Sequence, residues 1–447
     1  MSLHRDRIAL MLAAGPASAG ELGARLGVSQ PTLSRALNDM SGQLVRIRKG
    51  RSFSYALRDS GRGFSDITVY RVDPQGLVSQ LGTLVPVRDA GYVMLEADGS
   101  TLHSEGLPWW ILDMRPQGFM GRAYAGLHAV HLGLPSSLQD WSDSHAVRAL
   151  LAHGHDVTGN LLLGDLARER FLETAAYVPV ASEDRPKIYA QLSQTSLGDD
   201  QTWSSAGGEQ PKFTAYAETR FGLRHVIVKF SVLDDNPVSQ RWRDLLLSEH
   251  HAQEALLSAG VAASRTTVMD HAGQRFLEVE RFDRVGERGR QGLVSLSALD
   301  NEFVGLATGA WPEVTRTLCA DGVITEEAHA GACLLYAYGC LIGNTDMHHG
   351  NLAFLNTEGR PYAIAPAFDM LPMTFKPGSG GQITNTVKAV PLHSAVLSSA
   401  WRRALGIAGD FVQRLREDTS LSAEFRPCVT ALEDHLQVMG RKIALLA

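Results

Sequence analysis

The segment from Gly343 to Phe354 gathers polar side chains beside an apolar run. It reads GNTDMHHGNLAF and directly follows CLLYAYGCLI. A polar group is costly to bury unless it is bound, so this segment predicts a site of chemistry. Asp346 and Asn351 are five residues apart. At that spacing one loop can present both groups to the same phosphate, with Asp346 accepting a hydroxyl proton and Asn351 ligating Mg²⁺.

A second carboxylate follows eighteen residues after Asn351. Asp369 comes directly after the apolar stretch IAPAF, so a strand would deliver it to the loop. Mg²⁺ prefers one or two carboxylates together with phosphate oxygens. Asn351 and Asp369 are therefore the predicted metal ligands.

Upstream segments supply the positive charge that a phosphate needs. QTWSSAGGEQPKFTAYAE has the outline of a strand, a tight turn and a strand, and Gly207 and Gly208 let backbone amides approach an anion. Lys212 follows the turn, and the β-branched strand HVIVKFS carries Lys229 among apolar neighbours. Glu249 lies on the amphipathic helix that comes next. In protein kinases a strand Lys and a helix Glu form the pair that orients the ATP phosphates. The alternative for Glu249 is that it is only a charged residue on the solvent-exposed face of its helix.

The stretch QRFLEVERFDR predicts a strand that ends in charge. In a kinase architecture it would lead to the hinge between two lobes. Glu280 to Phe282 would be that hinge, with a backbone that reads the adenine edge; a sheet edge with surface ion pairs is the alternative. The order of glycine loop, strand Lys, helix Glu, catalytic Asp and Asn, and metal Asp agrees with a kinase from end to end.

The first sixty residues form a basic head on an acidic chain. Their net charge is +5, whereas the remainder carries −11, and a basic patch favours a polyanionic partner. A capping box at Ser18–Glu21, a second helix start at Ser29, and the hairpin LVRIRKGRSFSYAL predict a winged helix-turn-helix. A domain for dimerisation or protein contact is the alternative. The predicted DNA contacts are Gln30, Thr32, Arg35, Arg46, Arg48, Lys49 and Arg51. The polar stretch at 58–66 predicts a linker.

Composition limits the class of protein. Hydrophobic residues make up 44% of the chain and charged residues 20%, as in ordinary globular domains. The four cysteines show no CxxC pairing, which favours reduced, buried thiols in a cytoplasmic protein. The longest apolar run, at 331–343, is too short to span a bilayer and predicts a buried helix instead. The first twenty residues mimic a signal peptide, but Asp6 lies in the charged region and argues against one.

The motifs SSAGGEQPKF, VIVKFS, VERFDR, IGNTDMHHGNLAF and PAFDML resemble the HipA family of serine/threonine kinases, the toxins of bacterial toxin–antitoxin modules. With a helix-turn-helix fused in front, the chain is similar to the YjjJ-like branch of this family. The likeness covers roughly residues 66 to 447, and the head lies outside the core family pattern. It implies that Asp346 accepts the proton and that Ser204, or its neighbour Ser205, is autophosphorylated to switch the kinase off. It also implies ATP contacts from Ala206, Gly207, Gly208, Lys212, Lys229, Glu280, Arg281, Phe282, His348, Asn351 and Asp369.

The resemblance implies an α+β, two-lobed protein-kinase-like fold behind the winged helix-turn-helix. The expected domains are 1–60, a lobe with the ATP-binding sheet at 66–282, and a mainly helical lobe at 283–447. The expected cofactors are ATP and Mg²⁺. The expected partners are DNA, a protein substrate such as a component of the translation machinery, and an antitoxin, with no membrane.

Two departures from the family pattern stand out. The family usually has Lys before the catalytic-loop Asn, and here that residue is Gly350, so a positive group near the γ-phosphate is missing unless His349 replaces it. The family also reaches DNA through a separate antitoxin, whereas this chain carries its own reader.

Three other functions remain open. A small-molecule phosphotransferase would use a similar loop, but there the His precedes the Asp. A transcription regulator could use a kinase-like body only to sense a ligand, which Gly350 mildly favours. A metal-dependent hydrolase would use Asp346, His348, His349 and Asp369 around a metal.

Overall fold

The computed structural model describes residues 2–50, 52–174, 177–197, 210–357, 359–388 and 391–446. Contacts divide the chain into two units. One unit comprises Met1–Asp73, Leu77–Pro116 and His128–Thr174, and the other comprises Pro74–Gly76, Gln117–Leu127 and Ala175–Ala447. The predicted boundaries at 60, 66 and 282 stay predictions.

The basic head contains the helices and the hairpin that the sequence predicts. Ser18 caps its helix as expected, because its hydroxyl accepts the Glu21 amide at 3.2 Å and its own amide donates to the Glu21 carboxylate at 2.7 Å. Ile8, Leu12, Leu22, Leu33 and Leu37 fill the core between the helices. The first twenty residues, which mimic a signal peptide, therefore contribute a packed helix here. The elements are α1 (Ser2–Leu12), β1 (Ala17–Ser18), α2 (Ala19–Leu26), α3 (Gln30–Asp39), β2 (Leu44–Lys49) and β3 (Ser52–Leu57), with sheet order β1-β3-β2.

A larger antiparallel sheet follows in the same unit, in the order β7-β6-β5-β4-β8. Ile67, Val69, Leu84 and Tyr92 pack one of its faces against helix α5 through Val147 and Leu150. The elements are β4 (Ile67–Val72), β5 (Val78–Val87), β6 (Gly91–Glu96), β7 (Thr101–Ser104), α5 (Asp143–His153), β8 (Leu161–Leu163) and α6 (Asp165–Glu173). Helix α4 (Gly118–His128) follows β7 in sequence but, apart from His128, belongs to the second unit.

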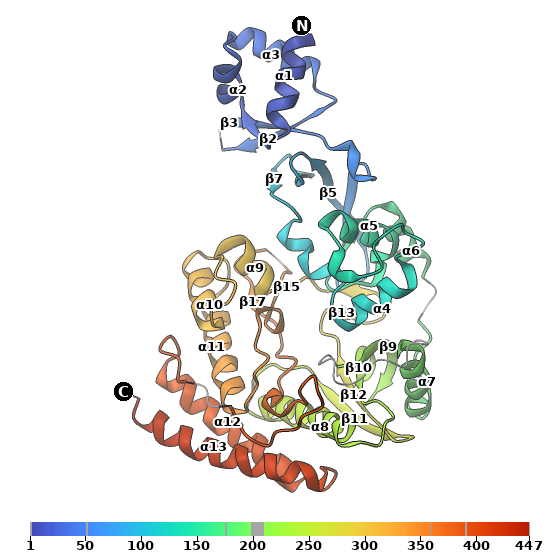
Figure 1. Ribbon diagram of the computed structural model, residues 1–447, viewed down its shortest axis with the longest axis vertical. Helices are drawn as coiled ribbons and strands as arrows, with labels where there is room; N and C mark the ends of the chain where they lie inside the picture. The colour runs from blue at the N-terminus through green and yellow to red at the C-terminus, as the bar shows by residue number, and fades with distance from the viewer. Residues whose placement is uncertain are drawn as a thin grey trace. The chain divides into compact units, whose positions relative to one another are not determined.

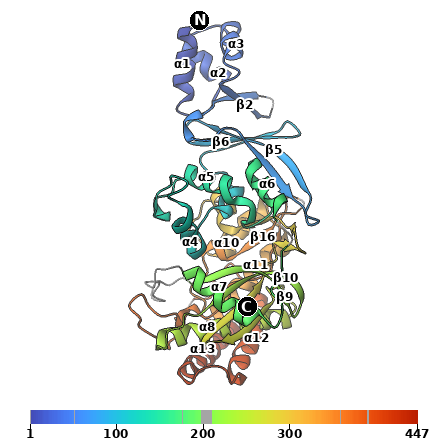
Figure 2. The same cartoon turned by 90° about the vertical axis from the view of Figure 1, so that its right-hand side faces the viewer.

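The prediction of a linker at 58–66 is wrong. Arg58 pairs with Asp66 at 2.6 Å, and Asp59 is 8% exposed, with its carboxylate held by Arg62 at 3.1 Å. Apolar residues also join the hairpin to the larger sheet, as the neighbouring strands in Figure 2 show. This shared core consists of Val45, Ile47, Ala56, Val85, Val87 and Val93. The sequence pattern was misleading because four of its charged side chains bond one another within the segment, Arg58 with Asp66 and Arg62 with Asp59.

The second unit begins with a sheet of order β11-β12-β10-β9, against which the long helix α8 packs (Figure 1). Phe213, Val228, Phe230 and Phe276 form one cluster with Tyr189 of α7, and Leu246 of α8 contacts Leu277 and Val279. The elements are α7 (Arg185–Leu197), β9 (Lys212–Thr219), β10 (Gly222–Phe230), α8 (Pro237–Ser258), β11 (Thr266–His271) and β12 (Gln274–Glu280).

A mainly helical part completes this unit. The predicted buried helix is α11, which begins where the Thr325 hydroxyl accepts the Ala328 amide at 3.0 Å. It lies against α12, which also packs on α13 and α8 (Figure 1). The elements are β13 (Arg284–Val285), β14 (Gly289–Arg290), β15 (Leu293–Ser295), α9 (Leu296–Phe303), α10 (Trp311–Ala320), α11 (Glu326–Leu341), β16 (Ala353–Leu355), β17 (Ala363–Ile364), α12 (Ser398–Glu417) and α13 (Arg426–Ala444).

Within the described ranges, no helix is both long and apolar enough to cross a membrane. The cysteines are free thiols, and Cys333, Cys340 and Cys428 are buried as predicted, whereas Cys319 is partly exposed.

Candidate active site

The predicted pair between the strand Lys and the helix Glu is present. The Lys229 ammonium donates to both carboxylate oxygens of Glu249, at 2.6 and 2.8 Å, and also to the Asp369 carboxylate. Lys229 and Glu249 are 6% and 1% exposed. Burial alone would lower the pKa of Lys229, but the two carboxylates raise it above its ordinary value. A charged ammonium therefore stands between the helix and the residue predicted to hold the metal.

A second lysine lies on the same face of the sheet. Lys212 of β9 is directly opposite Lys229 of β10 in the antiparallel register, and opposed residues point to the same side. Burial alone would raise the pKa of the Asp369 carboxyl, but Lys229 and Lys212 hold it below its usual value, with a smaller effect from His348. Asp369 therefore stays ionised and suited to a cation. Its backbone has a φ of 53°, a strained conformation for a residue other than glycine.

Hydrogen bonds connect Asp369 to the predicted catalytic loop. The Asn344 side chain donates to the Asp369 carbonyl oxygen at 3.3 Å and accepts the Asp346 amide at 3.0 Å. The Asn351 side chain in turn donates to the Asp346 carbonyl oxygen at 2.8 Å. The residues predicted to accept the proton and to hold Mg²⁺ thus belong to one bonded chain. Asn351 and Asp369 offer the oxygen ligands that a hard cation requires.

The two histidines of the loop have different surroundings. His349 is buried, donates from Nε2 to the Gly309 carbonyl oxygen at 2.6 Å and places Nδ1 3.3 Å from Asp300. It is therefore committed to the fold and does not replace the Lys that the family has at position 350. His348 is exposed, and its Nδ1 accepts the Gly350 amide at 3.0 Å. His348 is the imidazole of this loop that a ligand can reach, which also counts against the hydrolase hypothesis, since that needs both rings around a metal.

The predicted hinge lies at the end of β12. The Glu280 and Arg281 amides already donate to the carbonyl oxygens of Arg265 and His225, both at 2.9 Å, so these two amides cannot donate to an adenine. The Phe282 ring lies 5.8 Å from the Phe368 ring, next to Asp369. Among the hinge residues, Phe282 is therefore the one that the structure connects to the site.

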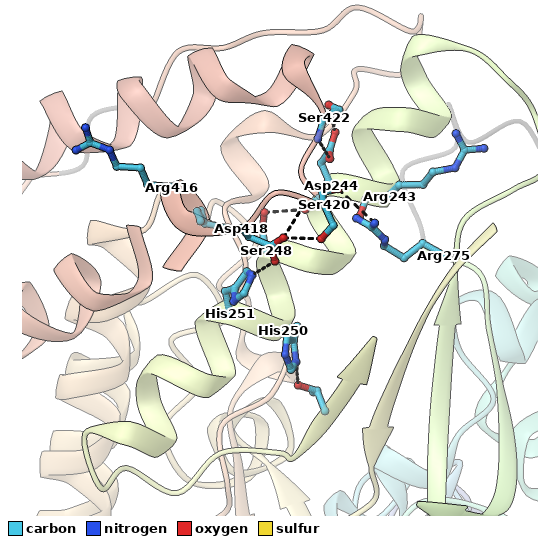
Figure 3. A network of polar contacts seen from close by, with 12 residues as sticks. Arg243, Asp244, Ser248, His250, His251, Arg275, Arg416, Asp418, Ser420 and Ser422 are labelled. Carbon is cyan, nitrogen blue, oxygen red and sulfur yellow. Dashed lines mark hydrogen bonds and ion pairs between the residues drawn. The ribbon is translucent and has the colours of Figure 1, made fainter. Parts of the chain in front are cut away.

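Partly buried polar contacts hold the helix that carries Glu249 (Figure 3). The Asp244 carboxylate accepts the Ser422 amide at 3.0 Å and its hydroxyl at 2.6 Å, while His251 Nε2 lies 2.6 Å from Asp418. Burial raises the pKa of Asp244 despite these donors. Asp244 and His251 flank Glu249 on α8, so the turn that joins α12 to α13 holds the helix on both sides of the pair.

The remaining predicted residues fall into two groups. Gln30, Thr32 and Arg35 are exposed on α3, and Arg46 and Arg48 are exposed on β2, where the Arg46 guanidinium covers the Phe53 ring at 4.2 Å. Outside the described residues lie Arg51, Ser204, Ser205, Ala206, Gly207 and Gly208, together with the side chain of Lys49.

Sequence reasoning missed the residues that support this site. Asn344 is 1% exposed and carries the bond between the two segments predicted to be catalytic, and Asp300 is 3% exposed beneath His349. Asn344 could have been found because it is a polar residue directly after the apolar run of α11. Asp300 has no comparable signal, since it lies on a separate helix far along the chain.

The four-stranded sheet, the helix that carries Glu249 and the helical part define a kinase-like fold of the HipA type. A solved Shewanella oneidensis MR-1 toxin–antitoxin complex of HipA, HipB and its operator DNA matches with a TM-score of 0.52 at 14% identity, over 85% of this chain and 98% of that chain. Residues 204–426 match the family model "HipA-like C-terminal domain", and residues 64–172 match "YjjJ-like toxin, middle domain". Toxin YjjJ of Escherichia coli (strain K12) is 37% identical over 436 residues, or 97% of this chain and 98% of that protein. The chain belongs to the YjjJ-like toxins of the HipA family.

Proposed function

We propose that this protein is an ATP-dependent serine/threonine protein kinase of the HipA type that acts as a growth-inhibiting toxin. One observation carries the proposal: Lys229, Asp369, Asn344, Asp346 and Asn351 form a continuous chain of hydrogen bonds. A phosphotransferase needs these functions within reach of one phosphate, because its catalysis depends on positioning and charge neutralisation.

Each residue has one role in the proposed reaction. Lys229 and Lys212 bind the phosphates, and Asn351 and Asp369 would hold Mg²⁺, which neutralises the charge that develops on the transferred group. Asp346 accepts the proton of a Ser or Thr hydroxyl. The oxygen of that hydroxyl bonds to the γ-phosphorus, while the bond between the γ-phosphorus and the oxygen of the β-phosphate breaks. The products are ADP and the phosphorylated protein.

The purified protein should be incubated with Mg²⁺ and γ-labelled ATP, and the phosphate mapped by mass spectrometry. We expect label on Ser204 or Ser205, lost in Ser204→Ala/Ser205→Ala, and a rate at least about 100-fold lower in Asp346→Asn with ATP still bound. An unchanged rate in Asp346→Asn would remove this residue from the role of base.

A second candidate is a transcription regulator whose kinase-like body only senses a nucleotide. It is favoured by Gly350, because His349 is buried against Asp300 and does not supply the missing positive group. ATP binding without any transfer of label would select this candidate.

We also propose that the head binds DNA. α3 would enter a major groove with Gln30, Thr32 and Arg35, while Arg46 and Arg48 lie along phosphates. The support is that these side chains are exposed on α3 and β2. A separate antitoxin stays an expectation from the family and a cytoplasmic location an expectation from the cysteines, and the protein substrate is left open.

A further inference from the structure

A buried arginine of α8 bonds to a segment that lies beyond the candidate site in the sequence. Arg241 is 3% exposed. One of its nitrogens donates to the Phe375 and Thr384 carbonyl oxygens at 3.2 and 2.8 Å, and the other donates to the Asn385 side chain at 2.7 Å. The guanidinium thereby joins two stretches of chain that are nine residues apart in sequence.

The segment that Arg241 holds packs on the start of the catalytic loop. The Thr374 amide donates to the Gly343 carbonyl oxygen at 2.9 Å. The Thr374 hydroxyl donates to the Thr386 carbonyl oxygen at 3.3 Å and accepts the Lys388 amide at 2.9 Å, so it ties the two stretches together.

Gly343 leaves no spare room at this contact. It has a φ of +72°, and a Cβ on it would lie 2.9 Å from the Thr374 methyl group and 3.4 Å from Val387. Gly343 precedes Asn344, whose side chain accepts the Asp346 amide. A shift of Thr374 would therefore be passed directly to the proposed proton acceptor.

We propose that Arg241 is a positioning residue for phosphoryl transfer. It acts by clamping the segment from Thr374 to Lys388 against Gly343, which sets the place of Asp346 in the loop. This inference rests on the proposed kinase activity. Arg241 lies on α8 eight residues before Glu249. Helix α8 would therefore have a second role, separate from the contact of Glu249 with Lys229.

The test compares Arg241→Ala with a matched buried arginine in the full-length protein. Arg185 is 8% exposed and bonds to Glu278 at 3.0 Å from α7, so Arg185→Ala controls for the general loss of a buried guanidinium. The measurements are autophosphorylation with γ-labelled ATP, calorimetric titration with ADP, and hydrogen exchange of peptides covering 343–347 and 374–388.

We expect Arg241→Ala to raise hydrogen exchange in both peptides. Phosphate transfer should slow about 100-fold, which is the cost of a small misplacement of a catalytic group. The affinity for ADP should stay within about twofold of wild type, because Lys229 keeps its partners. Arg185→Ala should leave both peptides unchanged. Arg241→Lys should not restore the rate, because an ammonium cannot reproduce the planar fork that reaches all of these acceptors.

The inference is overturned if exchange rises only at 374–388 while 343–347 and the transfer rate stay at wild type. It is equally overturned if Arg241→Lys restores the full rate, or if ADP binding is lost together with transfer. Should the wild type transfer no phosphate at all, the kinase proposal fails by itself, and exchange at 343–347 still decides whether Arg241 positions the loop.

Discussion

The Asn351 side-chain amide donates a 2.8 Å hydrogen bond to the Asp346 carbonyl oxygen and so closes the predicted catalytic loop on itself. Because the nitrogen of the amide is used inward, its oxygen is the atom left to face a cation. The loop thus fixes the direction of the proposed metal ligand through its own backbone.

Asn351→Asp separates the inward hydrogen bond of this side chain from its proposed role as a metal ligand. The variant keeps an oxygen for the metal but replaces the inward donor with a second acceptor, so we expect a loss of about 1–3 kcal/mol in unfolding free energy, together with slower transfer. Urea unfolding measures the first effect. Asn301→Asp, at an exposed position on α9, is the control and should change neither quantity.

The pair between Lys229 and Glu249 predicts a strongly non-additive result. Lys229→Met leaves a buried carboxylate without its partner and should cost about 3–5 kcal/mol, whereas Lys229→Met/Glu249→Leu removes both charges and should cost less than the single change. Chemical denaturation of both variants measures the difference. A double variant less stable than the single one would show that the pair is not the main buried interaction here.

Gly350 is predicted to be necessary for the position of the His348 ring. A Cβ at position 350 would lie 2.8 and 2.9 Å from the ring atoms Cε1 and Nδ1, so Gly350→Ala must displace the imidazole. We expect it to lower phosphate transfer and to have little further effect in a His348→Ala background. Gly406→Ala, where a Cβ meets open space, should leave transfer unchanged.

Arg48→Ala should weaken DNA binding evenly across sequences. An arginine on the wing that contacts a phosphate carries charge but no base recognition, so the slope of log affinity against log salt should fall by about one. Fluorescence anisotropy at several salt concentrations measures this. Arg416→Ala removes the same charge from an exposed site on α12 and should leave the slope as it is. A loss confined to one DNA sequence would mean that Arg48 reads bases.

His250 predicts a pH dependence of stability. Burial, with His251 and Arg220, lowers the pKa of His250 from 6.5 to about 4. Between pH 6.5 and 4 the unfolded chain therefore binds a proton that the folded protein does not. As the pH falls through this window, the unfolding free energy should fall by up to about 1.4 kcal/mol per pH unit.

His250→Gln should flatten that slope. His131→Gln changes an exposed histidine and should leave the slope intact. The prediction fails if both variants lose stability between pH 6.5 and 4 as steeply as the wild type does.

Local patterns were sufficient for much of this molecule. The capping box at Ser18, the buried helix at 331–343 and the pair between Lys229 and Glu249 all follow from residue type and spacing. Spacing works at such places because the partners are close in sequence, or because one strand and the next helix bring them together.

Contacts between distant segments could not be read in this way. Polar composition at 58–66 predicts a loose connection, yet Asp59 is buried among arginines. Likewise His349 and Asn344 look equivalent as polar residues of one loop, but Asp300 binds the first and Asp369 the second. Their roles depend on which segment folds over them, and sequence spacing does not contain that information.

The core shared by the hairpin and the larger sheet has a practical consequence for any attempt to separate the proposed DNA binding from the proposed kinase activity. Removing the chain before residue 64 would leave Val85, Val87 and Val93 without their cover from Val45 and Ile47, and an uncovered apolar sheet face promotes aggregation. A form that lacks the proposed DNA binding is better made with charge-reversing changes on α3 and β2. By the same reasoning, exchanging heads between relatives would succeed only if these strand faces were exchanged with them.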